Sequence, residues 1–249
     1  MFVVAILELS GGADDLARLA AELGTTLYEL KLTLGAGFPA VVLATVDPAL
    51  AASAVKTIDA HGHQAELLDR RDIVASSAMT ALRDFRFEPD ALVADTSRDE
   101  RLPYDDILAL LRASHRTTTT QTEDVKERKF RPGMAIATGG LVLSKTTTRE
   151  VTSRSEARQQ VLYLFRRSGS APMILGERTA RYGGLGADLR PTCLENFATT
   201  LRLLRERAPG AYYDERLMSG RPIRGVAEGI PAIDILAYLL AAHAAKTSR

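Results

Sequence analysis

Lysine and arginine side chains are the groups in this sequence whose spacing best fits a binding site. The predicted ligand-binding residues are Lys126, Arg128, Lys129, Arg131, Lys145, Arg149, Arg178 and Arg181. The first four surround Phe130 in the stretch KERKFR, a predicted loop between two strands that carry runs of threonine. Convergent ammonium and guanidinium groups bind phosphate, and hydroxyl groups add neutral donors. This set predicts a site for a phosphate-bearing or acidic ligand, and the alternative is a charged hairpin that only meets water.

Two of these arginines, together with Arg190, flank the glycine-rich stretch YGGLG at residues 182–186. The glycine spacing fits neither a dinucleotide-binding turn nor a phosphate-binding loop. We therefore predict a turn in which glycine supplies positive φ angles. Arg178, Arg181 and Arg190 still define an alternative function, in which an enzyme clamps a phosphorylated or nucleotide substrate with these side chains.

The stretch DAHGH offers Asp59, His61 and His63 as metal ligands. However, Gly62 stands where a glycine commonly ends a helix, and His61 would complement the helix dipole in the last turn. A metal site also needs further ligands, which the sequence does not supply nearby. No metal and no cofactor are predicted.

Nucleophiles and paired carboxylates give no catalytic pattern. The single cysteine, Cys193, excludes an intrachain disulfide and is predicted to be a buried or half-buried structural thiol. The adjacent acidic pairs Asp105–Asp106 and Asp214–Glu215 would point to opposite faces of a strand, which disfavours paired-carboxylate catalysis. No catalytic residue is predicted, so the chain is expected not to be an enzyme.

Charge is divided unevenly along the 249 residues. Residues 1–111 carry 9 Lys and Arg against 18 Asp and Glu, a net charge of −9, and residues 112–249 carry 23 against 13, a net charge of +10. This asymmetry predicts two domains, of which the second binds something anionic or attracts the first. No run approaches the roughly eighteen apolar residues that span a membrane, and the N-terminal stretch lacks the marks of a signal peptide. We expect a cytoplasmic protein.

The first seventy residues predict the order strand, helix, helix, strand, helix, strand. The strands are expected at residues 2–9, 38–46 and 63–69, and the helices at 13–24, 27–37 and 47–62. Thr25 or Thr26 can cap the second helix. Asp47 is the expected N-cap of the third helix, with Pro48 at its first position.

The remainder reads as strands separated by turns and followed by two helices. Strand-like segments lie at residues 85–95, 101–120, 140–153, 159–169 and 172–184. A helix is predicted over 191–208, with Thr192 and Glu195 as a capping box and Leu194 in its apolar stripe. Residues 211–229 are predicted to be a loop, and a last amphipathic helix covers 230–246.

Two resemblances carry expectations about fold and binding. The opening strand, LGTTLYELKLTL and AASAVKTIDAHGHQAELLD make residues 2–69 resemble the C-terminal domain of the bacterial ribosomal stalk protein, a fold shared with the protease adaptor ClpS. In that family, lysines on the second helix contact translational GTPases. Lys31 matches one such lysine, whereas Tyr28 stands in place of another. The resemblance implies a small βααβαβ domain.

A weaker resemblance covers residues 85–208, where RLPYDDILALL and the closing helix are similar to bacterial pleckstrin-homology-like domains. In those domains, a basic loop between strands is one ligand-binding place. This resemblance implies that KERKFR lies at such a place.

Together these features predict an α+β protein. We expect an acidic βααβαβ domain at residues 1–72, a connector at 73–84, a basic β-rich domain with its closing helix at 85–208, and a loop with a C-terminal amphipathic helix at 209–249. The predicted function is a non-catalytic adaptor or scaffold that binds a protein partner and an anionic ligand or surface. The alternatives are the enzyme described above and a self-assembling structural protein, which would be a homo-oligomer. Nucleic acid is not an expected partner, because no recognition motif accompanies the charge.

Overall fold

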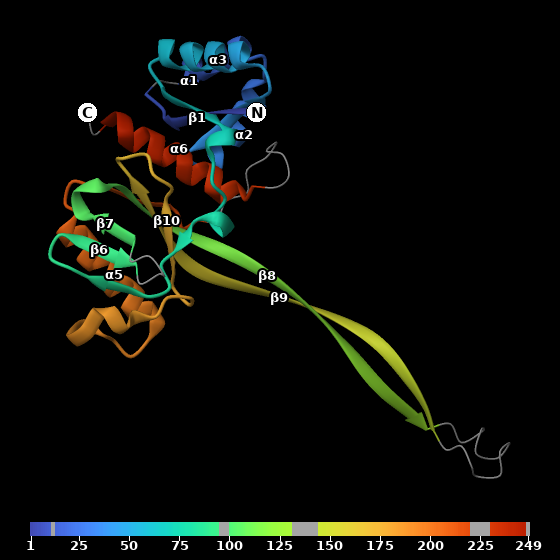
Figure 1. Cartoon of the computed structure of the whole chain (residues 1–249). Helices are drawn as coiled ribbons and strands as arrows, with labels where there is room; N and C mark the ends of the chain where they lie inside the picture. The colour runs from blue at the N-terminus through green and yellow to red at the C-terminus, as the bar shows by residue number, and fades with distance from the viewer. Residues whose placement is uncertain (11–12, 95–99, 131–143, 220–229, 248–249) are drawn as a thin grey trace. The chain divides into compact units, whose positions relative to one another are not determined.

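Helices and several sheets are mixed in the computed structural model of the chain, which is an α+β protein (Figure 1). The structure describes residues 1–10, 13–94, 100–130, 144–219 and 230–247, with side chains except at 13–14 and 116–157. The chain divides into two compact units. The first contains residues 1–115 and 159–249, and the second contains residues 116–158. The predicted boundaries at residues 72, 84 and 208 all fall inside the first unit, and whether the segments between them fold independently stays a prediction.

The six elements predicted for the first seventy residues are confirmed. They are β1 (Phe2–Glu8), α1 (Ala13–Glu22), α2 (Leu27–Gly35), β2 (Ala40–Thr45), α3 (Pro48–Ala60) and β3 (Gln64–Asp69). The strands form an antiparallel sheet in the order β2-β1-β3. Thr26 caps α2 in a capping box with Glu29, and Asp47 caps α3 by accepting hydrogen bonds from two backbone amides. Gly62 follows α3 with a φ of 77°, as its position in the sequence predicted.

The central strand β1 is apolar from Phe2 to Leu7, and both faces of its sheet are covered. Val4 and Ile6 pack into a core formed with α1, α2 and α3. Val3 and Leu7 face the opposite way and pack with α6 (Ala232–Thr247). Figure 1 shows α1 and α3 on one side of β1 and α6 on the other. A strand buried on both faces needs an unbroken apolar run, which is what the stretch FVVAIL provides.

The same helix, α6, also covers a second sheet. This sheet has the order β11-β8-β9-β10-β4, with bounds β4 (Thr80–Ala81), β8 (Ile107–Phe130), β9 (Ser144–Arg166), β10 (Met173–Gly176) and β11 (Tyr212–Leu217). Side chains of β8, β9 and β11 share one core with α6 and β1. The sequence predicts one apolar face on this helix, with Ile233, Leu236, Leu240 and Ala244. Ile235 and Leu239, which lie outside that face, are also fully buried. The amphipathic pattern predicted for this helix is therefore too narrow, because two sheets enclose it.

The opposite face of the second sheet packs on α5 (Cys193–Arg207) and a small sheet. The small antiparallel sheet contains β5 (Phe85–Phe87), β6 (Ala91–Ala94) and β7 (Glu100–Pro103). Thr192 and Glu195 form the predicted capping box of α5. Leu194 and Cys193, however, are exposed. Their predicted burial is wrong because the first turn of α5 lies beyond the edge of the core.

Three predictions about strands need correction. Residues 212–217 of the predicted loop form β11, which pairs in parallel with β8, for example Tyr212 with Ala109. The two strands predicted at 140–153 and 159–169 are one continuous strand from residue 144. The predicted connector at 73–84 contains the 3-10 turn η2 (Ser76–Ala78) and the short strand β4, and a further 3-10 turn, η1 (Arg70–Asp72), directly precedes it. Among the described residues, no helix combines the length and the apolar character needed to cross a bilayer.

Candidate functional site

The predicted anion-binding residues are divided between the two units. Lys126, Arg128 and Lys129 belong to β8, so the predicted loop at KERKFR is wrong for residues 126–130. The strand β8, whose neighbour in the sheet is β9, continues through this segment in place of the loop. Lys145 and Arg149 lie in β9, the neighbour of β8 in the sheet, as Figure 1 shows. Arg131 lies outside the described residues. The two threonine runs are parts of these strands, as predicted, and the convergence of the basic side chains stays a prediction.

Arg178 and Arg181 follow β10 in the first unit. The Arg181 guanidinium is 80% exposed and lies 3.2 Å from the carboxylate of Asp84. The backbone amide of Arg190 donates to Asn196 Oδ1 at 2.6 Å. None of the three arginines lines the cleft described below. The structure therefore does not bring them to a general base or nucleophile there.

The glycines of YGGLG have conformational and packing roles, as the predicted turn required. They lie in η4 (Tyr182–Asp188), where Gly186 has a φ of 55°. Gly184 packs so closely on β5 that an added Cβ would overlap the carbonyl oxygen of Phe85. This segment is a tightly packed turn.

The histidines of DAHGH face Asp15 of α1 instead of Asp59. His61 Nδ1 lies 2.6 Å from Asp15 Oδ1, and His61 Nε2 lies 3.3 Å from a Glu22 carboxylate oxygen. The hydrogen bond with Asp15 raises the pKa of His61 despite its partial desolvation, and the Glu22 carboxylate adds to this effect. The same hydrogen bond lowers the pKa of Asp15.

The hydrogen-bond geometry of His63 argues against metal binding. Its Nδ1 accepts a hydrogen bond from the Ser10 amide at 3.2 Å, so the proton of the neutral ring is on Nε2. That atom lies 3.3 Å from Asp15 Oδ2 and has no free lone pair for a metal. Among the residues that the structure describes, no group of three or more His, Cys, Asp and Glu side chains could hold a metal ion. The cluster joins α1 to the end of α3.

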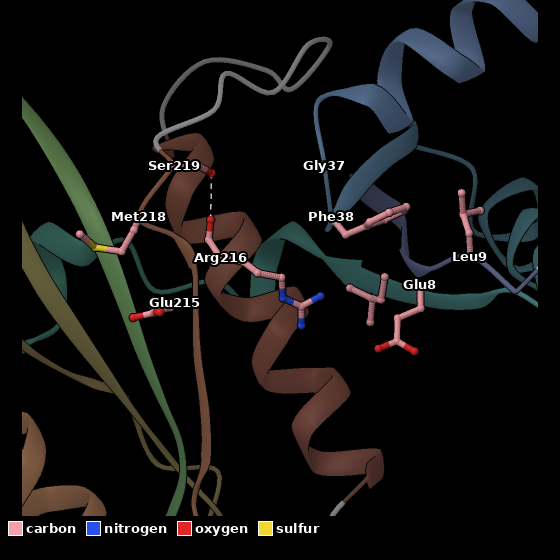
Figure 2. Close-up of a pocket in the computed structure, with 9 residues that line it drawn as sticks. Glu8, Leu9, Gly37, Phe38, Glu215, Arg216, Met218 and Ser219 are labelled. Atoms are coloured by element: carbon pink, nitrogen blue, oxygen red, sulfur yellow. Dashed lines mark hydrogen bonds between the residues drawn. The ribbon is translucent and has the colours of Figure 1, made fainter.

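A cleft between the first sheet and the wall formed by β11 and α6 is the best candidate site of the first unit. We call it the edge cleft, because it follows β2, an edge strand. One part, of about 800 Å³, runs along β2. Its principal walls are Leu32, Gly35, Phe38, Ala40, Val41, Val42, Arg216, Leu217, Ile233 and Leu236. The other part, of about 730 Å³, lies around Phe38, and Figure 2 shows its lining.

Arg216 borders both parts of the edge cleft. Its Nε donates to Asp214 Oδ2 at 2.7 Å, and its Nη2 donates to the Tyr212 hydroxyl at 2.8 Å. Burial raises the pKa of Asp214, but the hydrogen bonds from Arg216 and Tyr212 outweigh burial and hold it below its ordinary value. Figure 2 shows the Arg216 side chain extending from β11 toward the side of the cleft that carries Glu8 and Phe38. The guanidinium is thus held in a fixed position at the cleft.

Charge is distributed unevenly between the two parts. Along β2, Lys31 and Arg216 face one carboxylate, Glu29, whose oxygen already accepts hydrogen bonds from Thr26. Around Phe38, Glu8 and Glu215 accompany Arg216. By formal charge, the β2 part is basic and the Phe38 part is acidic.

A buried chain of hydrogen bonds holds α6 in place as one wall. The Tyr163 hydroxyl donates to Asp234 Oδ1 at 2.6 Å and therefore accepts from His115 Nε2, also at 2.6 Å. The Ser76 amide donates to the other Asp234 oxygen at 2.8 Å. Burial, followed by the nearby Asp234 carboxylate, raises the pKa of Tyr163, and burial lowers the pKa of His115. These bonds connect β8, β9 and the η2 segment to the N-terminal turn of α6.

No protein-family model matches the chain, and no curated protein or solved structure is significantly similar to it. The geometry of the edge cleft therefore carries the functional argument. Sequence reasoning missed this cleft because its walls come from residues as distant as Leu32 and Ile233. One local signal was present in the stretch YYDER. Tyr212 and Arg216 each lie two residues from Asp214, and both donate hydrogen bonds to its carboxylate.

Proposed function

We propose that the protein is a non-catalytic adaptor or scaffold that binds a protein partner in the edge cleft. The observation that carries this proposal is an open, largely apolar cleft with two oppositely charged parts. Clefts with apolar walls and a few placed polar groups are the usual ligand-binding sites of proteins.

The chemistry of the lining supports binding without catalysis. The described residues that line the edge cleft include no histidine or cysteine. The Ser219 hydroxyl donates to the carbonyl oxygen of Arg216 at 2.9 Å and has no adjacent base among them. A serine nucleophile needs such a base within hydrogen-bonding distance. Arg178, Arg181 and Arg190 lie outside this lining, and nothing at the cleft favours the alternative in which they clamp an enzyme's substrate.

The resemblances add further support to the proposal. The observed βααβαβ order of residues 2–69 fits the ribosomal stalk and ClpS-like fold, whose members bind other proteins. We also propose that residues 85–208 form a pleckstrin-homology-like domain. The cytoplasmic location and the domain boundaries given above are parts of the same proposal. Self-assembly into a homo-oligomer is the alternative for a scaffold of this kind.

Affinity capture from a cell lysate with matched leucine variants tests the proposed protein-binding role. Leu32 lines the cleft and is 46% exposed, whereas Leu50 on α3 is 50% exposed and lies outside the lining. Both can accept a charge without entering the core. We expect Leu32→Asp to lose a partner that the wild type and Leu50→Asp both retain. If the two variants capture the same proteins as the wild type, the edge cleft is not the partner site.

The second part of the proposal is an anionic ligand bound by the basic residues of β8 and β9. Tripolyphosphate is a suitable probe, because a small polyanion binds clustered lysine and arginine side chains and added salt should weaken that binding. We expect Lys126→Glu combined with Lys129→Glu to abolish its binding, and Lys56→Glu on α3 to leave binding unchanged. Equal binding by all three proteins would show that these strands carry no anion site.

A further inference from the structure

The strand β2 has one edge with which no described strand pairs, and it lines a wall of the edge cleft. Among the described strands, β2 has β1 as its one neighbour, so its other edge is unpaired. Residues Val41 to Thr45 are all partly exposed. The register between β1 and β2 shifts at Val42, which has no partner in β1 although Leu43 and Val41 do. The unpaired residue of a bulge and a free strand edge both leave amide and carbonyl groups available.

These groups and the apolar walls lie in the same cavity. Ala40, Val41 and Val42 line the part of the edge cleft along β2, opposite Ile233 and Leu236 of α6. An added strand pairs through its backbone and places alternate side chains on either face. One set of these side chains would enter the apolar part of the cleft.

We propose that the occupant of the edge cleft is an extended peptide segment of a partner protein, which pairs as an additional antiparallel strand with β2. This inference rests on the proposed adaptor function and names the chemistry of its partner. The apolar walls call for β-branched or other apolar residues at alternate positions of the peptide.

Charge complementarity gives the peptide a direction. The part along Ala40 to Val42 contains Lys31, and the part around Phe38, which precedes β2, contains Glu8. An antiparallel peptide runs from Val42 toward Phe38, so its N-terminal end meets the basic part and its C-terminal end meets the acidic part. The preferred segment therefore begins with an acidic residue and ends with a basic one.

Fluorescence polarisation with the full chain and a labelled heptapeptide, Asp-Val-Thr-Val-Thr-Val-Lys, tests this inference. N-methylation of single amides removes one donor at a time. We expect alternate positions to lose affinity by about three- to tenfold, the effect of one hydrogen bond, and the intervening positions to lose little. Exchanging the terminal Asp and Lys should weaken binding by about two- to fivefold, the effect of exposed ion pairs.

Lys31→Glu should weaken binding of the original peptide and remove its preference over the exchanged one, whereas Lys56→Glu should change neither. Amide hydrogen exchange provides a second measurement on the unmodified protein. The peptide should slow exchange within residues 40–45.

The outcomes separate this inference from the proposed function. If a lysate partner requires Leu32 but neither it nor the peptide protects residues 40–45, the strand-addition model is overturned and the adaptor role stands. Equal losses at all N-methylated positions would also overturn strand addition. If neither a partner nor a peptide binds, both proposals fail. If two copies of the chain pair through β2 and the peptide does not compete, the occupant is a second copy and the inference is wrong.

Discussion

His61 has a carboxylate near each of its two ring nitrogens, Asp15 at Nδ1 and Glu22 at Nε2. Its protonated form is therefore favoured in the folded state, where its pKa lies above the ordinary value of 6.5. A raised pKa contributes stability that is complete below the ordinary value and is lost as pH rises through the folded-state value. The neighbouring His63 ring stacks on His61.

We predict that His61→Gln lowers the free energy of unfolding more at about pH 6 than at about pH 9, because only the protonated ring gains from both carboxylates. Urea unfolding over a pH series measures this difference. Lys56→Gln, on α3, is the control, and its difference from wild type should not vary with pH. The comparison with wild type at each pH is necessary because the pKa of His115 is lowered, so His115 alone would reduce stability as pH falls below 6.5. A His61→Gln difference that does not vary with pH would exclude this contribution of the protonated His61 ring to stability.

The Tyr163 hydroxyl is a second residue whose loss should be costly. It bridges His115 Nε2 and Asp234 Oδ1, and Asp234 is fully buried. Tyr163→Phe leaves both partners without this bond. We predict that the free energy of unfolding falls by about 1–3 kcal/mol, the cost of unsatisfied buried polar groups. Tyr28→Phe, at a tyrosine that is 75% exposed, should change it little in the same chemical denaturation experiment. Equal stability of the two variants would contradict this role.

Among the elements, the turn η4 is held against β5 by the absence of a side chain at Gly184. An added Cβ would overlap the carbonyl oxygen of Phe85, whereas a Cβ at the adjacent Gly183 meets nothing within 4 Å. We predict that Gly184→Ala lowers the melting temperature, with a destabilisation of about 1–3 kcal/mol from overpacking. Gly183→Ala should unfold at the wild-type temperature. Calorimetry on both variants tests the packing role, and similar melting temperatures would contradict it.

The helices and strands show which parts of the fold local sequence patterns can predict. Helix caps at Thr26, Asp47 and Thr192 were predictable because each cap binds amides within three residues of itself. The strand β11 was missed because it is made a strand by pairing with β8, about a hundred residues away. The sequence of β11 also lacks the alternation of apolar and polar residues that is typical of a strand, because it contains polar residues such as Asp214 and Arg216, which pair with each other.

The edge cleft could not be predicted for a related reason. Its walls belong to α2, β2, β11 and α6, and only the tertiary fold brings them together. The sequence identified Lys31 through a family resemblance, but it gave no reason to place Lys31 beside Arg216. Lys145 and Arg149 of β9 were recognised correctly as members of a strand. KERKFR, in which β8 continues to Phe130, was assigned to a loop because charge and a following Pro-Gly pair are typical of turns.

At the scale of the whole molecule, α6 connects the parts of the first unit. It lies between the sheet of β1 and the sheet of β8 and β9, and its side chains share one core with both. The last described helix of the chain therefore shares one core with Val3, near the start of the chain. The acidic residues 1–111 share this unit with residues 159–249 of the basic second half, so the charge difference does not coincide with the division into two units.

The second unit, residues 116–158, should be dispensable for folding of the first. Arg112 precedes this unit and Gln160 follows it, and the two residues are in contact because Arg112 Nη2 donates to Gln160 Oε1 at 2.7 Å. We predict that replacing residues 116–158 with Asn-Gly, a pair that favours a tight hairpin turn, leaves a chain that unfolds cooperatively in urea. Its peptide binding should match the wild type, because the edge cleft lies in the first unit. Its tripolyphosphate binding should disappear, because Lys126, Lys129 and Lys145 are removed. Loss of cooperative unfolding would show that the first unit depends on the second, and retained anion binding would move the anion site to the first unit.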